Sequence, residues 1–175
     1  SYKGALAGSR THRAHNQSRV VRQRQPVENL LQTLTFLGVA DLARHAAQAA
    51  SGNYGPCRVA EGIVAGGDLT VGSKVRELFE AQIVAAGGRM RGMRHGVAWD
   101  EHESVSKYAS RTVPLHQVMD PKFREGFAQL APLGMSFESW QYHPQLPDAI
   151  DLARSFPDTT IILNHVGGVL GVGPY

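Results

Sequence analysis

The sequence predicts an α/β fold in which helices cover a sheet of parallel strands. Between Cys57 and Gly168, short apolar runs alternate with segments of helical periodicity, and glycine or proline punctuates the boundaries. Four strands with intervening helices are expected there, and this alternation is typical of a parallel sheet. The 175 residues are enough for one domain with a hydrophobic core.

The expected elements follow one another in a regular order. Strands are expected at 58–65, 89–95, 135–141 and 159–163, and helices at 72–86, 120–133 and 145–155. Asp120 and Pro121 supply the capping residue and the first-turn proline of the second helix. On the third helix, the apolar side is expected to consist of Ile150, Leu152 and Ala153.

We divide the chain at residue 50. Residues 1–50 are expected to form a basic N-terminal arm and a helical segment over 26–50, which Gly38 interrupts; two helices in place of one are the alternative. Residues 51–175 are the expected α/β domain. The arm fits a solvated terminus better than an anion-binding one, because no nucleic-acid-binding motif accompanies its arginines, so no nucleic-acid partner is expected.

Cysteine content and hydropathy indicate a soluble, cytoplasmic protein. The single cysteine, Cys57, excludes an intramolecular disulfide and fits a reducing compartment. No apolar run approaches the roughly 20 residues that span a bilayer, and no signal peptide opens the chain. We therefore expect no membrane partner.

Two histidines follow the third and fourth predicted strands at matching positions. His143 is followed by proline, and His165 by Val-Gly-Gly. Because parallel strands joined by a right-handed crossover end at the same edge, both histidines are expected at the carboxyl edge, where α/β sheets bind ligands. Neutral imidazoles there suit a divalent metal or a general base, and hence hydrolysis of an ester, lactone or amide. The alternative is that each histidine only caps its strand.

Arg94 lies late on the second predicted strand and is expected at the same edge. Its guanidinium suits a substrate carboxylate. The alternative is an ion pair with Asp100 or Glu101. His95 and Trp99, which follow it, are weaker candidates for substrate contacts.

Five motifs between residues 51 and 175 carry a family resemblance: GIVAGGDL (62–69), RGMRH (91–95), FREGF (123–127), WQYHPQL (140–146) and LNHVGG (163–168). In combination they resemble the amidohydrolase-related family of TIM-barrel, metal-dependent hydrolases. That family includes lactonases and, in a sister branch, carboxylate decarboxylases, which are lyases.

The resemblance implies a partial TIM (β/α)8 barrel comprising its third to sixth strands. It implies that His143 and His165 are metal ligands, that His165 is also the catalytic group, and that Arg94 binds substrate. A divalent metal, zinc or manganese, is expected in the complete protein, although some family members work without one. The first-strand His-x-His pair and the eighth-strand aspartate of the family are absent, and 175 residues fall short of the roughly 250 of a whole barrel.

The implied activity is hydrolysis of a lactone or a related carboxylated small molecule. Water would attack the carbonyl with help from a metal, a histidine or both. One alternative is a non-oxidative decarboxylase that uses the same histidines. Another is a catalytically incomplete fragment, and its exposed strand edges would favour a homo-oligomer.

Overall fold

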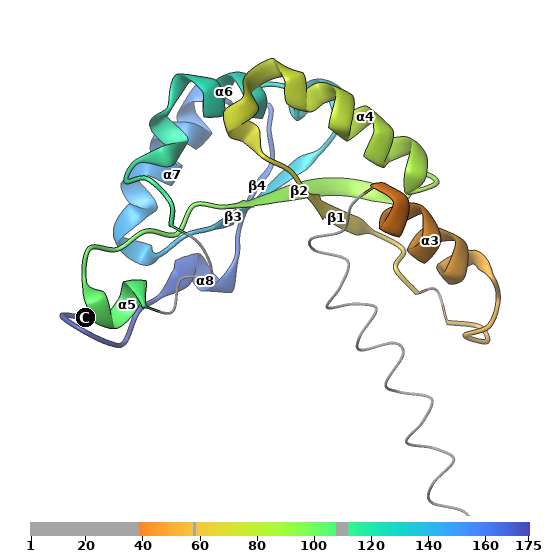
Figure 1. Cartoon of the computed structure of the whole chain (residues 1–175), viewed down its shortest axis with the longest axis horizontal. Coiled ribbons are helices and arrows are strands. Elements are labelled where there is room, and N and C mark those ends of the chain that lie inside the picture. The colour runs from red at the N-terminus through yellow and green to blue at the C-terminus, as the bar shows by residue number, and fades with distance from the viewer. Residues whose placement is uncertain (1–38, 58, 108–111) are drawn as a thin grey trace, which may run out of the picture.

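The computed structural model describes residues 39–57, 59–107 and 112–175, which are built around one parallel sheet (Figure 1). Its four strands lie in the order β1–β2–β3–β4, so each pairs with the next one along the chain. The strands are β1 (Ile63–Gly66), β2 (Met90–Gly96), β3 (Ser136–Trp140) and β4 (Ile161–Leu163). This order is that of consecutive β/α units in a (β/α)8 barrel. The predicted α/β class and partial barrel are confirmed.

Helices and helical turns separate the strands. The α-helices are α3 (Val39–Ala50), α4 (Val75–Ala85), α5 (Glu103–Ser106), α6 (Pro121–Phe127) and α7 (Leu146–Ser155), and the short turn α8 (His165–Gly168) follows β4. The 3-10 turns are η1 (Leu69–Lys74), η2 (Gln117–Met119), η3 (Ala131–Leu133) and η4 (His143–Gln145). None of the helices in the described ranges is both long and apolar enough to cross a membrane.

Helices α4, α6 and α7 cover one face of the sheet, as Figure 1 shows. The core between them is aromatic: the ring of Phe137 on β3 lies 5.1 Å from that of Phe127 and 6.2 Å from that of Phe123, both on α6. These three side chains and Phe79 of α4 are fully buried. Burial of each such side chain is worth roughly 1.5–3 kcal/mol, so this cluster holds the helices on the sheet.

The opposite face of the sheet carries the alternate side chains. Because successive residues of a strand point to opposite sides, Arg94, Glu138, Trp140 and Ile162 face away from α4, α6 and α7. We call this side of the sheet the open face. It would line the inside of a closed barrel.

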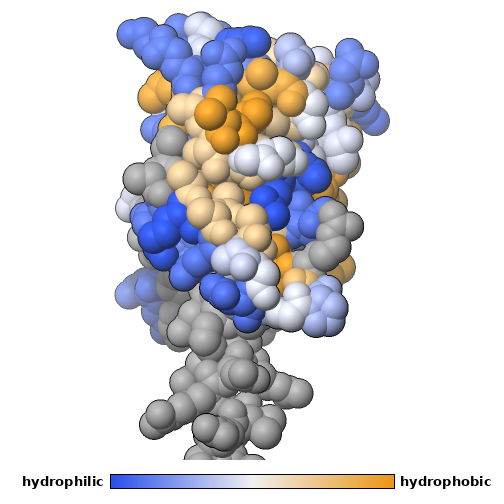
Figure 2. Space-filling model, turned by 90° about the vertical axis from the view of Figure 1, so that its right-hand side faces the viewer, coloured by the Kyte–Doolittle hydropathy of each residue, from blue (hydrophilic) through white to orange (hydrophobic). Residues whose placement is uncertain are grey.

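Helix α3 packs beside α4, and its Leu42 belongs to the same hydrophobic core. The end of the molecule at which these helices lie carries an apolar strip bordered by hydrophilic side chains (Figure 2). Val84 of α4 is 81% exposed. The predicted basic arm and the first part of the predicted 26–50 helix lie outside the described residues, and the division at residue 50 stays a prediction.

The expected apolar side of the third helix was wrong. On α7, Ile150 and Ala153 are exposed, whereas Leu152 and Ala149 are buried. The side of this segment that meets the core therefore carries Ala149, Leu152 and Phe156. The way the helix lies on the sheet, rather than hydropathy alone, determines which side is buried.

The starts of the first strand and the first helix were also misplaced. Strand β1 begins at Ile63 rather than at residue 58, after a turn in which Ala60 has a positive φ of 49°. Helix α4 begins at Val75, because Gly72 adopts φ 71° and ψ −149° and breaks the helical path of η1.

The contact between α6 and η1 gives a test of this packing. A Cβ at Gly126 of α6 would lie 2.4 Å from the carbonyl oxygen of Leu69, so Gly126→Ala must push the two elements apart. We expect it to lower the free energy of unfolding by about 1–3 kcal/mol, measured by denaturant unfolding followed by circular dichroism. Gly171→Ala is the matched control, because a Cβ there has no heavy atom within 4 Å. Equal stability of the two variants would contradict the close packing.

Candidate active site

The open face carries an ion pair between neighbouring strands. Arg94 of β2 and Glu138 of β3 are direct register partners, and Arg94 Nε donates to Glu138 Oε2 at 2.9 Å. Arg94 Nη2 donates to the same oxygen. The side chains are 21% and 15% exposed. The alternative interpretation, that Arg94 forms an ion pair, is therefore correct, but the predicted partners Asp100 and Glu101 were wrong. Glu138 is the partner because it lies opposite Arg94 on the same face of the sheet.

Asn164 joins this pair to the end of β4. Its side-chain Nδ2 donates to Glu138 Oε2 at 3.0 Å, and its backbone N–H donates to the carbonyl of Ser139 at 3.1 Å. Glu138 therefore links side chains from the ends of β2 and β4. Arg94, Glu138 and Asn164 form what we call the open-face network.

His165 comes directly after Asn164 and lies beside the same strand. Its ring is 4.8 Å from that of Trp140 at an interplanar angle of 63°, which is an edge-to-face contact. Trp140 is two residues after Glu138 on β3, so both point to the open face. Glu138 thus joins the predicted substrate-binding arginine to Asn164, the residue that precedes the predicted catalytic histidine. An exposed imidazole at this position can accept or donate a proton.

A strained turn holds His165 at this edge. All four residues of α8 have positive φ, with 51° at His165, 55° at Val166, 76° at Gly167 and 66° at Gly168. A left-handed conformation costs a non-glycine residue roughly 1–2 kcal/mol. Gly168 packs so closely on β3 that a Cβ would lie 1.8 Å from the carbonyl oxygen of Gln141. This close packing makes glycine necessary there and fixes the turn.

His143 follows β3 at the same edge but has different surroundings. Its Nδ1 accepts a hydrogen bond from the N–H of Leu170 at 3.2 Å, and its ring lies 5.1 Å from that of Tyr175. Within the described part of the chain, no hydrogen bond or ring contact joins His143 to His165. The chain segment after α8 therefore packs on His143.

The described residues do not complete a metal site. No group of three or more His, Cys, Asp or Glu side chains in the described ranges is placed to hold a metal ion. Catalytic zinc sites use three protein ligands, so His143 and His165 would need others from elsewhere. Their role as metal ligands stays a prediction, and we assign no chemical step to a metal.

His95 and Trp99 lie apart from the open-face network. His95 is 2% exposed; its Nδ1 accepts from the N–H of Leu69 at 3.1 Å, and its ring packs on Phe123 under the helices. Trp99 is half-buried in the loop after β2, and its backbone N–H donates to Gln145 Oε1 at 2.9 Å. Their predicted substrate contacts stay predictions.

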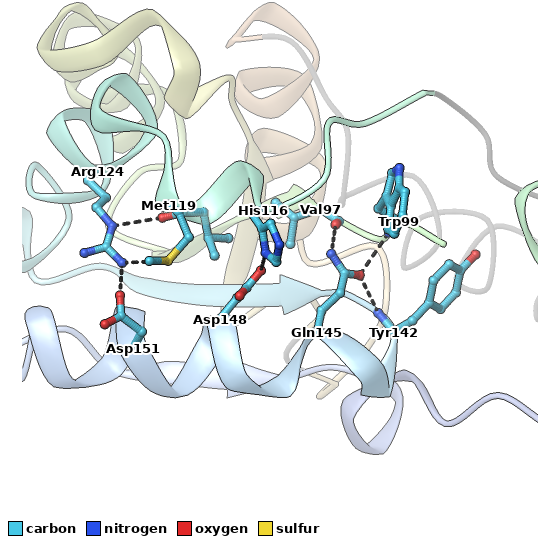
Figure 3. A network of polar contacts seen from close by, with 10 residues as sticks. Val97, Trp99, His116, Met119, Arg124, Tyr142, Gln145, Asp148 and Asp151 are labelled. Carbon is cyan, nitrogen blue, oxygen red and sulfur yellow. Dashed lines mark hydrogen bonds and ion pairs between the residues drawn. The ribbon is translucent and has the colours of Figure 1, made fainter. Parts of the chain in front are cut away.

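Gln145, which the sequence analysis did not single out, ties two loops at the carboxyl edge (Figure 3). Its Nε2 donates to the carbonyl of Val97 at 2.8 Å, while its Oε1 accepts from the backbone N–H groups of Trp99 and Tyr142. The side chain is buried. A glutamine at a helix start gives no pattern that would reveal such a role.

The row of polar ties continues along α7 (Figure 3). His116 Nδ1 lies 2.8 Å from Asp148 Oδ2, and Arg124 forms an ion pair with Asp151. Gln145, Asp148 and Asp151 are three residues apart, so they lie along one side of the helix. Gln145 and Asp148 fasten the connection between β2 and α6 (residues 97–120) to α7, and the Arg124–Asp151 pair fastens α6 to α7.

Tyr175 anchors the last residues of the chain to the loop after β2. Its hydroxyl donates to Asp100 Oδ2 at 2.6 Å. This hydrogen bond raises the pKa of Tyr175 above its ordinary value of 10.0, with smaller contributions from burial and from the negative charges of Asp100 and Glu101. The neutral phenol is therefore the form that the folded chain favours.

A pH titration tests that anchor. Because the pKa of Tyr175 is raised in the folded chain, its hydrogen bond to Asp100 stabilises the fold below about pH 10. This stabilisation is lost as the pH rises through the pKa of Tyr175 in the folded chain. The difference in tyrosinate absorbance between the wild type and Tyr175→Phe should therefore titrate above pH 10. In the Asp100→Asn background the same difference should titrate at a lower pH. An identical titration in both backgrounds would contradict the Asp100 contact.

The strain at Val166 has a measurable consequence. This side chain is 89% exposed, so Val166→Gly removes little buried surface and relieves the left-handed backbone. We expect a gain of about 1 kcal/mol in the free energy of unfolding. Val169 is also exposed but has an ordinary φ of −60°, so Val169→Gly should instead lose about 0.5–1 kcal/mol. Destabilisation by both changes would argue against strain in α8.

Comparison with known proteins agrees with this architecture. The profile of the family described as Amidohydrolase matches residues 31–172. The uncharacterized protein y4mH of Sinorhizobium fredii (strain NBRC 101917 / NGR234) is 47% identical over 47 residues, which are 27% of this chain and 16% of that protein. No solved structure matches. Because the family profile covers most of the chain and the described strands form consecutive β/α units, this chain belongs to the amidohydrolase family.

Proposed function

We propose that the protein is a hydrolase that opens a lactone or a related carboxylated small molecule. The observation that carries this proposal is that Arg94 and His165 share one region of the open face: Glu138 joins Arg94 to Asn164, and His165, the next residue, packs on Trp140. A cationic donor and an exposed imidazole at the same edge of the sheet suit substrate binding together with proton transfer. Family membership supports hydrolase chemistry in general.

In the proposed reaction, Arg94 donates a hydrogen bond to a substrate oxygen and so orients the ring. His165 takes a proton from water as the water oxygen bonds to the carbonyl carbon. The acyl carbon–oxygen bond of the ring then breaks, and His165 returns the proton to the leaving oxygen. The product is a hydroxy acid. Proton transfer of this kind contributes typically 10²–10⁴-fold to a rate.

Trp140 supplies the apolar part of the proposed site. Its ring packs edge-to-face with His165, which limits the orientations of the imidazole. The indole also offers a flat surface for the carbon atoms of a small ring. Substrate orientation would thus depend on a polar contact at Arg94 and an apolar contact at Trp140.

Members of this family commonly use divalent metal ions, and zinc or manganese is the cofactor that we propose for the whole protein. His143 and His165 would contribute two ligands. The described residues do not supply the rest of a site, so the steps above use side chains alone.

A non-oxidative decarboxylase remains the second enzymatic interpretation, because the same residues would serve it. The products separate the two reactions. Lactone opening releases an acid proton, whereas decarboxylation releases carbon dioxide.

The proposed partner is the small-molecule substrate alone, without nucleic acid or membrane, in the cytoplasm. Association with a second copy of the chain is also proposed. It is supported by β1 and β4, each of which pairs with one neighbour in the described sheet, and by the apolar strip on α3 and α4 (Figure 2).

Substitution of His165 tests the proposed reaction. We expect His165→Asn to lower kcat/KM for lactone opening by about 10²–10⁴-fold, followed by proton release across a panel of lactones. Asparagine tolerates a left-handed backbone, so the turn should survive. His116 is exposed and left-handed as well, at φ 57°, and makes His116→Asn the matched control, with activity expected within about twofold of wild type.

Equal activity of the His165→Asn and wild-type proteins would remove His165 from the mechanism. Carbon dioxide release without lactone opening would favour the decarboxylase. If the purified protein forms neither product, the hydrolase proposal has no support.

A further inference from the structure

We propose that Glu138 determines the specificity of this site by balancing the charge of Arg94, so that the site prefers an uncharged, oxygen-bearing group over a carboxylate. This inference rests on the proposed function and narrows its substrate class. It arises from the hydrogen bonds of the open-face network.

One carboxylate oxygen of Glu138 already occupies one side of the Arg94 guanidinium. Nε and Nη2 of Arg94 both donate to Oε2 of Glu138. This adjacent pair of donors is one that a guanidinium uses to bind a carboxylate. A substrate carboxylate would have to displace Glu138 or bind at the far end of Arg94, close to the negative charge of Glu138.

Burial strengthens this effect. Arg94 and Glu138 are 21% and 15% exposed, so solvent screens their charges less than it would on an open surface. The two formal charges cancel, and Asn164 and Trp140 add none. An anion entering this part of the open face would therefore gain little net attraction and would meet the Glu138 carboxylate.

The remaining donors and acceptors suit a neutral group. In the part of the chain that the structure describes, Nη1 of Arg94 and Oε1 of Glu138 take part in no hydrogen bond. A hydroxyl group can accept from the first and donate to the second. A carboxylate can only accept, so it cannot satisfy Oε1.

A purely structural role for Glu138 makes a different prediction. If the ion pair only tied β2 to β3, its loss would loosen the site and weaken every ligand. If Glu138 sets specificity, removal of its charge should weaken a neutral ligand and strengthen an anionic one. Opposite changes are thus the distinguishing result.

Two ligands with the same ring separate these possibilities without any turnover. Tetrahydropyran-4-ol and tetrahydropyran-4-carboxylate cannot be hydrolysed, so their dissociation constants do not depend on catalysis. Binding is followed by the NMR shift of the Trp140 indole N–H, assigned with Trp99→Phe. We expect the wild type to prefer the alcohol. Glu138→Gln should bind the carboxylate about tenfold more tightly than the wild type does, and the alcohol more weakly.

Two further variants serve as controls. Glu80→Gln makes the same change in net charge at the exposed Arg76–Glu80 pair and should leave the preference unchanged. Glu138→Asp keeps the charge and should keep the preference for the alcohol, even where its affinity falls.

The proposal is overturned if the wild type prefers the carboxylate, if it binds neither ring, or if Glu138→Gln weakens both ligands alike. The first two results need no variant to fold. Loss of lactone opening with the binding preference intact would instead count against the hydrolase proposal alone.

Discussion

The burial of Phe137 between the sheet and α6 is the constraint on which the rest of this structure depends. Its ring packs against those of Phe123 and Phe127 and is excluded from solvent. Because side chains alternate along a strand, placing Phe137 under the helices places Glu138 on the opposite face. The hydrophobic core thus determines which face of the sheet carries polar chemistry, before any ligand is considered.

The sequence predicted the elements well because their signals are local. Capping by Asp120 and Pro121, the glycine after the second helix and the apolar strands each depend on a few neighbouring residues. The buried side of α7 was harder to predict from the sequence, since it depends on how the helix lies on the sheet. The same limit applies to His95, whose burial under α6 follows from packing rather than from its neighbours in the chain.

The candidate site was only partly predictable for a related reason. Arg94 and His165 were predicted to be edge residues. Glu138, however, joins Arg94 to Asn164, the neighbour of His165, and predicting this requires the register of β2, β3 and β4. The alternation of side chains along β3 places Glu138 on the face opposite Phe137, but it does not identify Arg94 and Asn164 as the hydrogen-bond partners of Glu138. The left-handed conformation of His165 and Val166 also has no signal in neighbouring residues, because it belongs to a turn whose last residue, Gly168, packs against Gln141 after β3. The two predicted histidines consequently differ: His143 is held by the segment after α8, whereas His165 projects from a strained turn.

The polar contacts spaced along α7 also limit which sequence changes the long connection after β2 can accept. Gln145 holds this connection near its start, at Val97 and Trp99, and Asp148 holds it near its end, at His116, so the entropic cost of ordering one long loop is divided among shorter spans. Loss of one tie releases only the span beside it. Sequence drift in this connection should therefore be tolerated in segments, with the anchored positions constrained and the spans between them free to vary.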